Sequence, residues 1–315
     1  MTLSADVVIP TYGHYELTER CLRSLGHQTI AHTVIVSDNA STDDTVEQVR
    51  ASFPDVVILA SEANRGFAAA CNRGAAAGSG EIIVLLNSDV DPRPDFLEQL
   101  IAPFSDDDVG SVAALLLQVD EKTIDTVGVT VDRTLAGFPR LQGRPAADAV
   151  APHPALAGPS GGAAAYRRTA WEQVGGLDER IFMYGEDVDL ALRLRAARWR
   201  TVAAPNAVGI HLGSASVGGQ RSRAKQQHLS FSRGYLVRRY GILASRVAPR
   251  ALASEAIVVV GYALLEHDLS PLRCRIDGWR AAKGLPRNPA PPLDAIDRAI
   301  GFRESLRLRR RIHFG

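Results

Sequence analysis

Several features that would point to a particular class of protein are scarce in this 315-residue sequence. It has only three cysteines, Cys21, Cys71 and Cys274, which form no CxxC pair and cannot all pair with one another. This disfavours a disulfide-stapled secreted framework and leads us to expect a reducing, cytoplasmic setting. The formal net charge is only +1, so the composition gives no sign of a nucleic-acid partner.

The sequence leads us to expect neither a leader nor a membrane-spanning segment. Residues 1–6 do not combine a basic region with an apolar stretch, so no signal peptide is expected. The longest apolar run near the C-terminus, residues 256–265, is shorter than the roughly 20 residues that span a bilayer. With 46% hydrophobic residues, the chain can nevertheless bury a large core in one or two domains.

Short apolar runs alternate with helical patterns over about the first hundred residues. The predicted strands lie at 7–10, 34–36, 56–59 and 81–86, and helices follow each of them, including 67–77 and 95–104. The runs are continuous, which is typical of strands buried on both faces. The pattern predicts an α/β fold with a mostly parallel sheet and helices on both faces. Ligands of such sheets bind beyond the carboxyl ends of the strands, where Thr11, Asp38, Asn64 and Asp89 fall.

Two acidic clusters are the strongest chemical signals. Asn87-Ser88-Asp89 ends the fourth apolar run, and Glu186-Asp187 begins a helical pattern that runs to about residue 197. The first suits a divalent cation on a phosphate group, and the second suits a positioned proton acceptor. A plain strand-end turn, or acids that complement a helix dipole, would explain each cluster without any function. Asp189 lies four residues before Arg193, and we expect a structural ion pair between them.

The pattern loosens after residue 105. A strand is predicted at 109–117, and residues 120–160, rich in Gly, Pro and Ala, are expected to cross the face of the site. Another strand is predicted at 200–204, with His211 in the loop that follows. From residue 220 the sequence reads as basic, amphipathic helices. They could contact an anionic membrane surface, although a solvated basic face is the commoner reason for such a pattern.

Six stretches carry a family pattern. They are Val8-Ile9-Pro10-Thr11-Tyr12, Ser37-Asp38-Asn39-Ala40-Ser41-Thr42-Asp43, Asn64-Arg65-Gly66-Phe67 with the residues to Gly74, Leu85-Leu86-Asn87-Ser88-Asp89, Gly175-Gly176-Leu177-Asp178-Glu179 and Tyr184-Gly185-Glu186-Asp187-Val188-Asp189-Leu190. In this order and spacing, residues 5–217 resemble inverting family 2 glycosyltransferases of the rhamnosyltransferase-like bacterial branch. The resemblance implies a Rossmann-like GT-A catalytic domain at 1–217, followed by a helical C-terminal extension at 218–315.

The resemblance also implies roles for the acidic clusters. Asn87-Ser88-Asp89 stands where the family has its DxD motif, with Asn in the first place. Asp89 is then the expected carboxylate on Mn²⁺ or Mg²⁺, while Asn87 and Ser88 meet the ribose or a metal-bound water. His211 would complete the metal shell, which would favour Mn²⁺ because imidazole binds Mg²⁺ poorly. Asp187 would be the catalytic base, and Glu186 would orient the acceptor or the donor sugar.

Other residues are assigned to the donor by the same resemblance. The implied nucleotide contacts are Pro10, Thr11, Tyr12, Asp38 and Asn39, with Asn64, Arg65 and Gly66 closing the pocket. Gly161 and Gly162 either let the sugar rings approach the backbone, since no Cβ blocks them, or form a tight turn without ligand contact.

The expected activity is metal-dependent, inverting transfer of a single sugar. The branch favours rhamnose, carried by a dTDP- or UDP-sugar, and the acceptor hydroxyl would belong to a glycan, a lipid-linked glycan or a small-molecule natural product. The protein would work in the cytoplasm, with the inner face of the membrane as a further possibility, and the sequence gives no sign of a particular oligomeric state.

Two other functions are weighed against transfer. A sugar-1-phosphate nucleotidyltransferase would want a Gly-rich basic loop after the first strand, which residues 10–14 lack. A non-catalytic sugar-nucleotide-binding protein would not need Asp89, Glu186 and Asp187 together.

Overall fold

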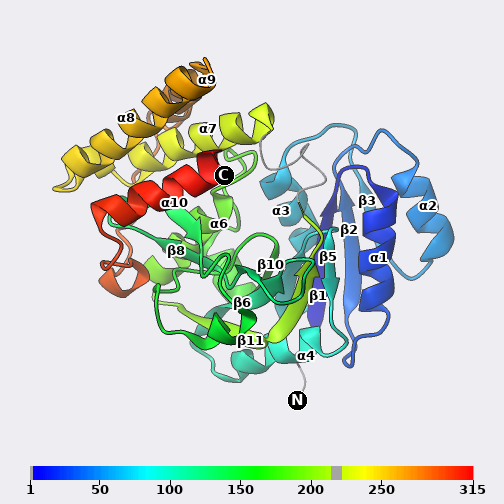
Figure 1. Cartoon of the computed structure of the whole chain (residues 1–315). Coiled ribbons are helices and arrows are strands. Elements are labelled where there is room, and N and C mark those ends of the chain that lie inside the picture. The colour runs from blue at the N-terminus through cyan, green and yellow to red at the C-terminus, as the bar shows by residue number, and fades with distance from the viewer. Residues whose placement is uncertain (1–2, 214–221, 315) are drawn as a thin grey trace.

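The centre of the molecule is a mixed sheet of nine strands. The computed structural model describes residues 3–213 and 222–314, and its sheet has the order β3-β2-β1-β4-β10-β6-β11-β5, with β7 paired to β6. The bounds are β1 Ala5–Thr11, β2 Thr33–Asp38, β3 Val57–Ala60, β4 Ile82–Leu86, β5 Val90–Pro92, β6 Val109–Leu117, β7 Ile124–Thr126, β10 Ala163–Arg167 and β11 Arg200–His211. Strands β1 to β4 are parallel, whereas β10 runs antiparallel between β4 and β6 (Figure 1).

Helices cover both faces of this sheet, as predicted. They are α1 Tyr15–Leu25, α2 Thr45–Ser52, α3 Phe67–Ala77, α4 Phe96–Ile101, α5 Arg168–Val174 and α6 Glu186–Ala196. Alternate residues of β4 point to opposite sides: Ile82 and Val84 pack into the cluster of α1 and α4, and Ile83 and Leu85 into that of α3, α5 and α6. Each face is apolar, and so the whole of β4 is apolar.

Most predicted elements have the expected bounds, but the end of the sheet differs. Helix α3 and strand β6 match their predicted ranges, and α4 is shorter because a 3-10 turn, Ala102–Ser105, replaces its end. The prediction that His211 lies in a loop is wrong, because β11 continues to that residue. A register shift between Ala204 and Val208 interrupts the pairing with β6, and the strand then resumes against β6 and β5. Pro205 lies in this shift and cannot donate to the ladder, which explains why the predicted strand ends at residue 204.

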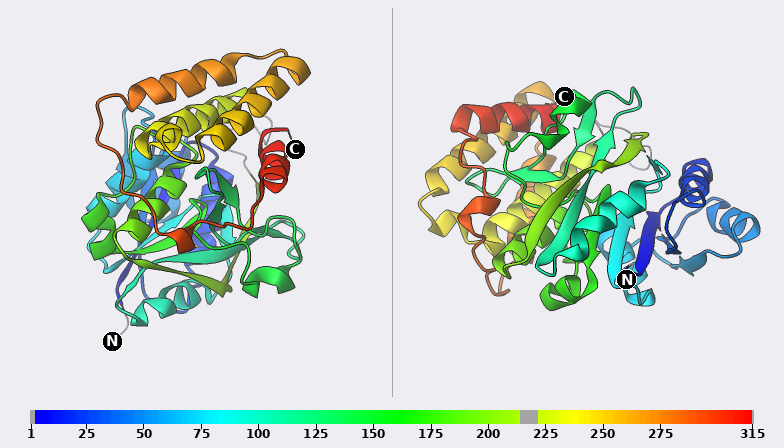
Figure 2. Two further views of the ribbon diagram at one scale, coloured as in Figure 1. Left: turned by 90° about the vertical axis from the view of Figure 1, so that its left-hand side faces the viewer. Right: turned by 90° about the horizontal axis from the view of Figure 1, so that it is seen from below.

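The rest of the chain is helical and lies against one end of the sheet domain (Figures 1 and 2). It contains α7 Arg223–Arg239, α8 Ala248–Leu265, α9 Ser270–Ala281 and α10 Phe302–Phe314. Helix α10 packs Leu308 and Ile312 on Phe138 of the small hairpin β8 (Val129–Val131) and β9 (Gly137–Pro139). The boundary predicted at 217/218 falls outside the described residues. Among those residues one helix, α8, is long and apolar enough to cross a membrane by length and composition, and 22% of it is buried.

Helices α7 and α9 cross at two glycines. A Cβ on Gly234 would lie 1.9 Å from the carbonyl oxygen of Arg275, and a Cβ on Gly278 would lie 1.9 Å from that of Phe231. Backbone therefore touches backbone at the crossing, and no side chain can yield to relieve a larger residue. The close crossing depends on both positions lacking a side chain.

Gly278→Ala should accordingly destabilise the protein. Alanine is the better helix former by about 1 kcal/mol, but forcing the helices apart in a packed core typically costs about 1–3 kcal/mol, so the net loss is the smaller remainder. The measurement is the midpoint of urea unfolding, with Gly301→Ala as control, since nothing lies within 4 Å of a Cβ there. Equal midpoints for the two variants would show that the crossing tolerates separation.

Candidate active site

The carboxyl ends of the central strands open into a cavity of about 430 Å³. Its walls come from the strand ends of the sheet, the β8–β9 hairpin, the start of α6, and helices α7 and α10. Most of the candidate residues line it: Pro10, Thr11, Tyr12, Asn39, Asn64, Asn87, Ser88, Asp89, Gly161, Gly162, Glu186, Asp187 and His211. Both acidic clusters, separated by about a hundred residues in sequence, therefore face one space.

One side of the cavity carries the first cluster. Asp89 follows β4 and is buried, and its Oδ2 lies 3.4 Å from Nε2 of His211 at the end of β11. The other ring nitrogen of His211, Nδ1, is 2.8 Å from Oδ2 of Asp125 in β7. The imidazole is thus held between two carboxylates. Burial lowers the pKa of His211, but the hydrogen bonds and charges of Asp125 and Asp89 outweigh it and raise that pKa to about 10. The two carboxylates make this a place that favours positive charge.

The donor atoms here fit a hard divalent cation. Ligands at about 2.1 Å and right angles from one ion lie about 3 Å apart, close to the observed separation of Asp89 and His211. The Asp125–His211 contact has the carboxylate–histidine form that orients a metal-binding imidazole. Over the described ranges no three His, Cys, Asp or Glu side chains are grouped closely enough to hold a metal alone. A cation here would consequently take its remaining ligands from phosphate and water, as Mg²⁺ commonly does.

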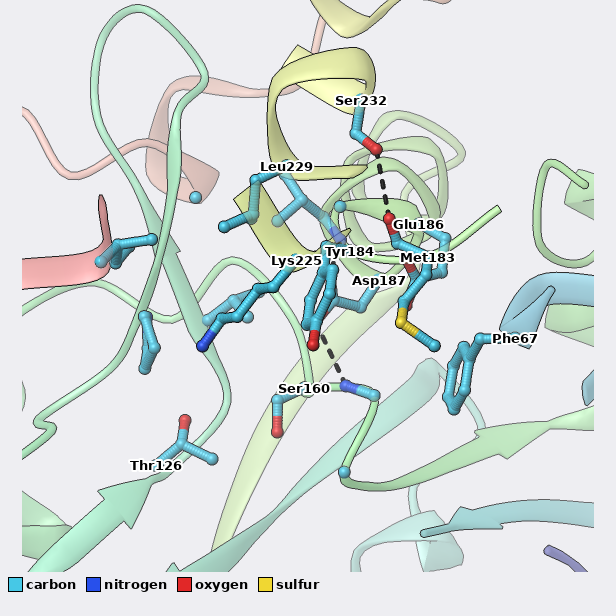
Figure 3. Close-up of a pocket in the computed structure, with 18 of the residues that line it drawn as sticks. Phe67, Thr126, Ser160, Met183, Tyr184, Glu186, Asp187, Lys225, Leu229 and Ser232 are labelled. Carbon is cyan, nitrogen blue, oxygen red and sulfur yellow. Dashed lines mark hydrogen bonds between the residues drawn. The ribbon is translucent and has the colours of Figure 1, made fainter. Parts of the chain in front are cut away.

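The opposite side of the cavity carries the second cluster, at the start of α6. Gly161 donates its backbone N–H to Oδ2 of Asp187 at 3.2 Å, and Val188 donates to Oδ1 at 2.7 Å, which fixes the carboxylate (Figure 3). Burial raises the pKa of Asp187, and these two N–H groups offset part of the rise. Asp189 instead pairs with Arg193 at 2.7 Å, which confirms the predicted structural ion pair.

Glu186 is the more deeply buried of the two acids, at 5% exposure. Within the described part of the chain its Oε2 has no hydrogen-bond partner, although the residue lines the cavity. Burial first, and then the charge of Asp187, raise the pKa of Glu186 well above its usual range. A buried carboxyl group that favours its neutral form and has an unpartnered oxygen at a cavity is suited to a hydroxyl of a bound molecule.

The nucleotide-side candidates divide into two groups. Asn39 and Asn64 line the cavity and are joined by a hydrogen bond of 2.8 Å from Nδ2 of Asn39 to Oδ1 of Asn64. Asp38, Arg65 and Gly66 lie outside the lining as far as the structure describes it. The carboxylate of Asp38 accepts from the N–H and hydroxyl of Ser41.

Gly66 has a packing role. Its φ is +91°, and a Cβ there would lie 2.5 Å from the carbonyl oxygen of Phe182. Arg65, which also lies outside the lining, donates its backbone N–H to Oδ1 of Asn39 at 2.9 Å. Both residues therefore shape the loop in which Asn64 and Asn39 meet.

Sequence reasoning missed several charged residues of the cavity, among them Asp125 and Lys225. Asp125 comes from the stretch at 120–160, whose composition resembles an ordinary loop. Lys225 lies in the first turn of α7 and extends into the cavity, with Nζ 5.8 Å from the centre of the Tyr184 ring (Figure 3). Burial lowers the pKa of Lys225, and the charge of Asp125 opposes that shift. The helical pattern from residue 220 was the only signal for Lys225, and it did not say which face meets the site.

Comparisons with known sequences give a family match. A family model described as Glycosyl transferase family 2 matches residues 6–175. The N-acetylglucosaminyl-diphospho-decaprenol L-rhamnosyltransferase of Mycobacterium tuberculosis is 31% identical over 242 residues, which are 69% of this chain and 79% of that protein. The pre-mycofactocin glycosyltransferase of the same organism is 30% identical over 205 residues, 65% of this chain and 42% of its own.

Solved structures share the fold at low identity. The mannosyltransferase PcManGT of Pyrobaculum calidifontis, in complex with GDP-Man and Mn²⁺, matches with a TM-score of 0.57 and 19% identity, over 90% of this chain and 87% of that one. GalNAc-T7 with UDP, GalNAc and Mn²⁺ matches with a TM-score of 0.61 and 15% identity, over 88% and 54%. These likenesses show the fold, and the family match shows the enzyme class. The chain is a GT-A-fold glycosyltransferase that belongs to glycosyl transferase family 2.

Proposed function

We propose that this enzyme transfers one sugar, rhamnose, from a dTDP- or UDP-sugar to a hydroxyl of a lipid-linked glycan, with inversion at the anomeric carbon. The choice of sugar and acceptor is supported by the name of the Mycobacterium tuberculosis relative, a rhamnosyltransferase whose acceptor is a diphospho-decaprenol. The Mn²⁺ ions in PcManGT and GalNAc-T7 support the use of Mn²⁺ or Mg²⁺. The reaction would take place at the cytoplasmic face of the membrane.

The single observation that carries the proposal is the shared cavity. Asp89 and His211 line it from the strand ends, and Glu186 and Asp187 line it from the start of α6. Inverting displacement needs a group that stabilises the departing diphosphate and, across the anomeric carbon, a base for the acceptor hydroxyl. Two acidic sites mounted on separate walls suit these two tasks.

Each residue then has a separate task. Asp89 and His211 would hold the cation, which when bound supplies positive charge to the diphosphate oxygens. Asp187 accepts the proton of the acceptor hydroxyl. As it does so, the hydroxyl oxygen bonds to the anomeric carbon and the bond from that carbon to the nucleoside diphosphate breaks. The protonated Glu186 donates a hydrogen bond to a sugar hydroxyl. Pro10, Thr11, Tyr12, Asn39, Asn64, Asn87 and Ser88 would enclose the nucleotide.

The test is a donor and acceptor screen with the purified chain. dTDP-rhamnose and a panel of UDP-sugars are incubated with Mn²⁺ and an N-acetylglucosaminyl-diphospho-polyprenol, and products are identified by mass spectrometry. We expect one added rhamnose per acceptor and release of the nucleoside diphosphate. Transfer of a different sugar would overturn the donor assignment, and transfer only to water-soluble acceptors would overturn the lipid-linked one.

Two substitutions of Glu186 should show whether its charge or its hydrogen bonds matter for transfer. Because burial and the charge of Asp187 favour the neutral form of Glu186, Glu186→Gln keeps a donor and an acceptor at the same place, and transfer should fall by less than about tenfold, the value of one ordinary hydrogen bond. Glu186→Ala removes both groups and should lower kcat/KM by substantially more.

The readout is kcat/KM for the donor in each variant, with the melting temperature as a check on folding. An inactive, folded Glu186→Gln protein would show that Glu186 acts as an ionised group.

A further inference from the structure

Helix α8 has its polar and apolar faces reversed with respect to solvent. Between residues 251 and 265 every exposed residue is apolar: Leu252, Ala253, Ala256, Ile257, Val260, Leu264 and Leu265. Leu264 is 70% exposed and Leu265 is 71% exposed. Surface helices of globular proteins normally turn polar residues outward, so this face is built for contact with something other than water.

The inward face of α8 holds the polar side chains of this stretch, beside the apolar Ala251 and Val258, and it is firmly anchored. Glu255 accepts from Arg233 and Arg309 at 2.7 Å each and from Arg275 at 3.0 Å. Tyr262 is fully buried and its hydroxyl lies 2.9 Å from Nδ1 of His313. Crossing a bilayer would strip Glu255 of these three cations, and removing the partners of a buried charge is strongly unfavourable. The helix is therefore anchored to the body of the protein with its apolar side outward.

The apolar surface continues beyond α8. Leu269 in the turn, and Leu272 and Ile276 in α9, are 41–55% exposed. Nine of the 15 exposed large hydrophobic residues in the described ranges lie between 243 and 276. Figures 1 and 2 show α8 and α9 on the outside of the molecule, at the end away from α1 and α2. We name residues 248–276 with these side chains the α8–α9 surface.

Exposed basic residues lie within and on both sides of this segment of the sequence. The exposed charged residues between 243 and 287 are Arg246, Arg273, Arg280, Lys283 and Arg287 against Glu266 and Asp277. The surplus of positive charge suits a partner that is apolar and bears anionic groups. A two-fold dimer through the same face would place these basic residues against their own copies, and like charges would oppose the contact.

The inward side of α8 also lies close to the cavity. The ring of Phe314 packs on Tyr262 of α8 with ring centres 4.7 Å apart, and the preceding residues of α10, from Arg311 to His313, line the cavity. Under the proposed function the acceptor carries a lipid chain, so its sugar must reach the cavity while the chain remains in a membrane. A membrane against the α8–α9 surface would lie next to the helix that packs on α10 at the cavity wall.

From these observations we infer that the α8–α9 surface seats the enzyme on an anionic phospholipid bilayer, with α8 lying in the plane of the interface. The exposed leucines and valine enter the boundary between headgroups and acyl chains, and the flanking arginines meet the lipid phosphates. The inference rests on the proposed lipid-linked acceptor only for the identity of the partner; the reversed polarity of α8 is independent of it.

Vesicle flotation of the full chain tests this seating without donor or acceptor. Wild-type protein should float with vesicles of equal parts phosphatidylglycerol and phosphatidylcholine, and more weakly with phosphatidylcholine alone. Val260→Glu/Leu264→Glu changes two outward side chains and should weaken binding to the mixed vesicles by more than about tenfold. Val119→Glu/Val150→Glu, two exposed valines that are 66% and 74% accessible on the sheet domain, is the matched control and should bind like the wild type.

Several outcomes would overturn the inference. Equal flotation of wild type and the α8 variant would do so, as would absence of flotation together with a dimer in sedimentation that the α8 variant dissociates. Retention on vesicles in alkaline carbonate would indicate a spanning helix in place of an interfacial one. Donor hydrolysis in vesicle-free solution should be the same in wild type and both variants. Failure of the proposed function would abolish transfer yet leave flotation intact, so the two failures are distinguishable.

Discussion

Asp187→Asn should abolish sugar transfer and leave donor binding nearly unchanged. A positioned base contributes about 10²–10⁴-fold to such reactions, and an amide cannot accept the hydroxyl proton. Asparagine has the same shape and its Oδ1 can still accept one of the N–H groups of Gly161 and Val188, so the start of α6 should remain folded. The loss should therefore appear in kcat, with the affinity for the donor nucleotide retained.

The experiment combines two measurements. Initial rates of transfer give kcat, and calorimetric titration with UDP or dTDP gives nucleotide affinity. Glu172→Gln is the control, because this exposed acid on α5 also loses a charge but lies outside the cavity. A folded Asp187→Asn enzyme with wild-type kcat would remove Asp187 as the base.

The pH profile supplies an independent check on the same residue. Asp187 must be ionised to accept a proton, and burial raises its pKa. The rate of the wild-type enzyme should accordingly be full above that pKa and fall as the pH is lowered through it, beginning above the usual range of an aspartate. In Asp187→Asn the residual rate should lose this limb.

Much of the site could be predicted because parallel sheets gather their strand ends. Thr11 ends β1 and Asp89 follows β4. These are two neighbouring strands with continuous apolar runs, so the sequence alone predicts that both residues lie at one edge of the sheet. The role of Asp38 was harder to predict from its place. It ends β2 as expected, but its carboxylate is taken by Ser41 three residues on, a local turn that a strand-end rule does not foresee.

The remaining parts depend on long-range packing. Asp125 reaches His211 only because β7 folds back on β6 while β11 pairs along the other side of β6, and no periodicity at 120–160 encodes that arrangement. The sequence likewise does not predict that the apolar side of α8 faces solvent. Its buried side contains the apolar Ala251 and Val258 as well as polar residues, and the arginines contributed by α7, α9 and α10 around Glu255 decide which side faces inward.

Asp89→Ala should cause the other large loss, and it should act through metal-dependent donor binding. A divalent cation on a departing diphosphate contributes several kcal/mol, so transfer should fall by about a thousandfold or more. Calorimetric titration of the donor nucleotide with and without Mn²⁺ should show that the affinity gained from Mn²⁺ in the wild type is lost in the variant. An unchanged gain in affinity would place the cation elsewhere.

Substitution of two neighbouring acids, Asp91 and Asp125, should cause smaller losses than Asp89→Ala in the same measurements. Asp91 lies two residues from Asp89 but pairs with Arg20 at 2.8 Å on the surface, so Asp91→Asn should retain both transfer and the Mn²⁺ effect. Asp125→Asn leaves the proposed ligands in place but weakens the orientation of His211, and the loss of such an orienting partner typically costs about 10–100-fold in metal affinity. The order of loss should therefore be Asp89→Ala, then Asp125→Asn, then Asp91→Asn. An Asp125→Asn enzyme as impaired as Asp89→Ala would mean that Asp125 itself contacts the cation, because orientation of an imidazole alone cannot account for a loss of that size.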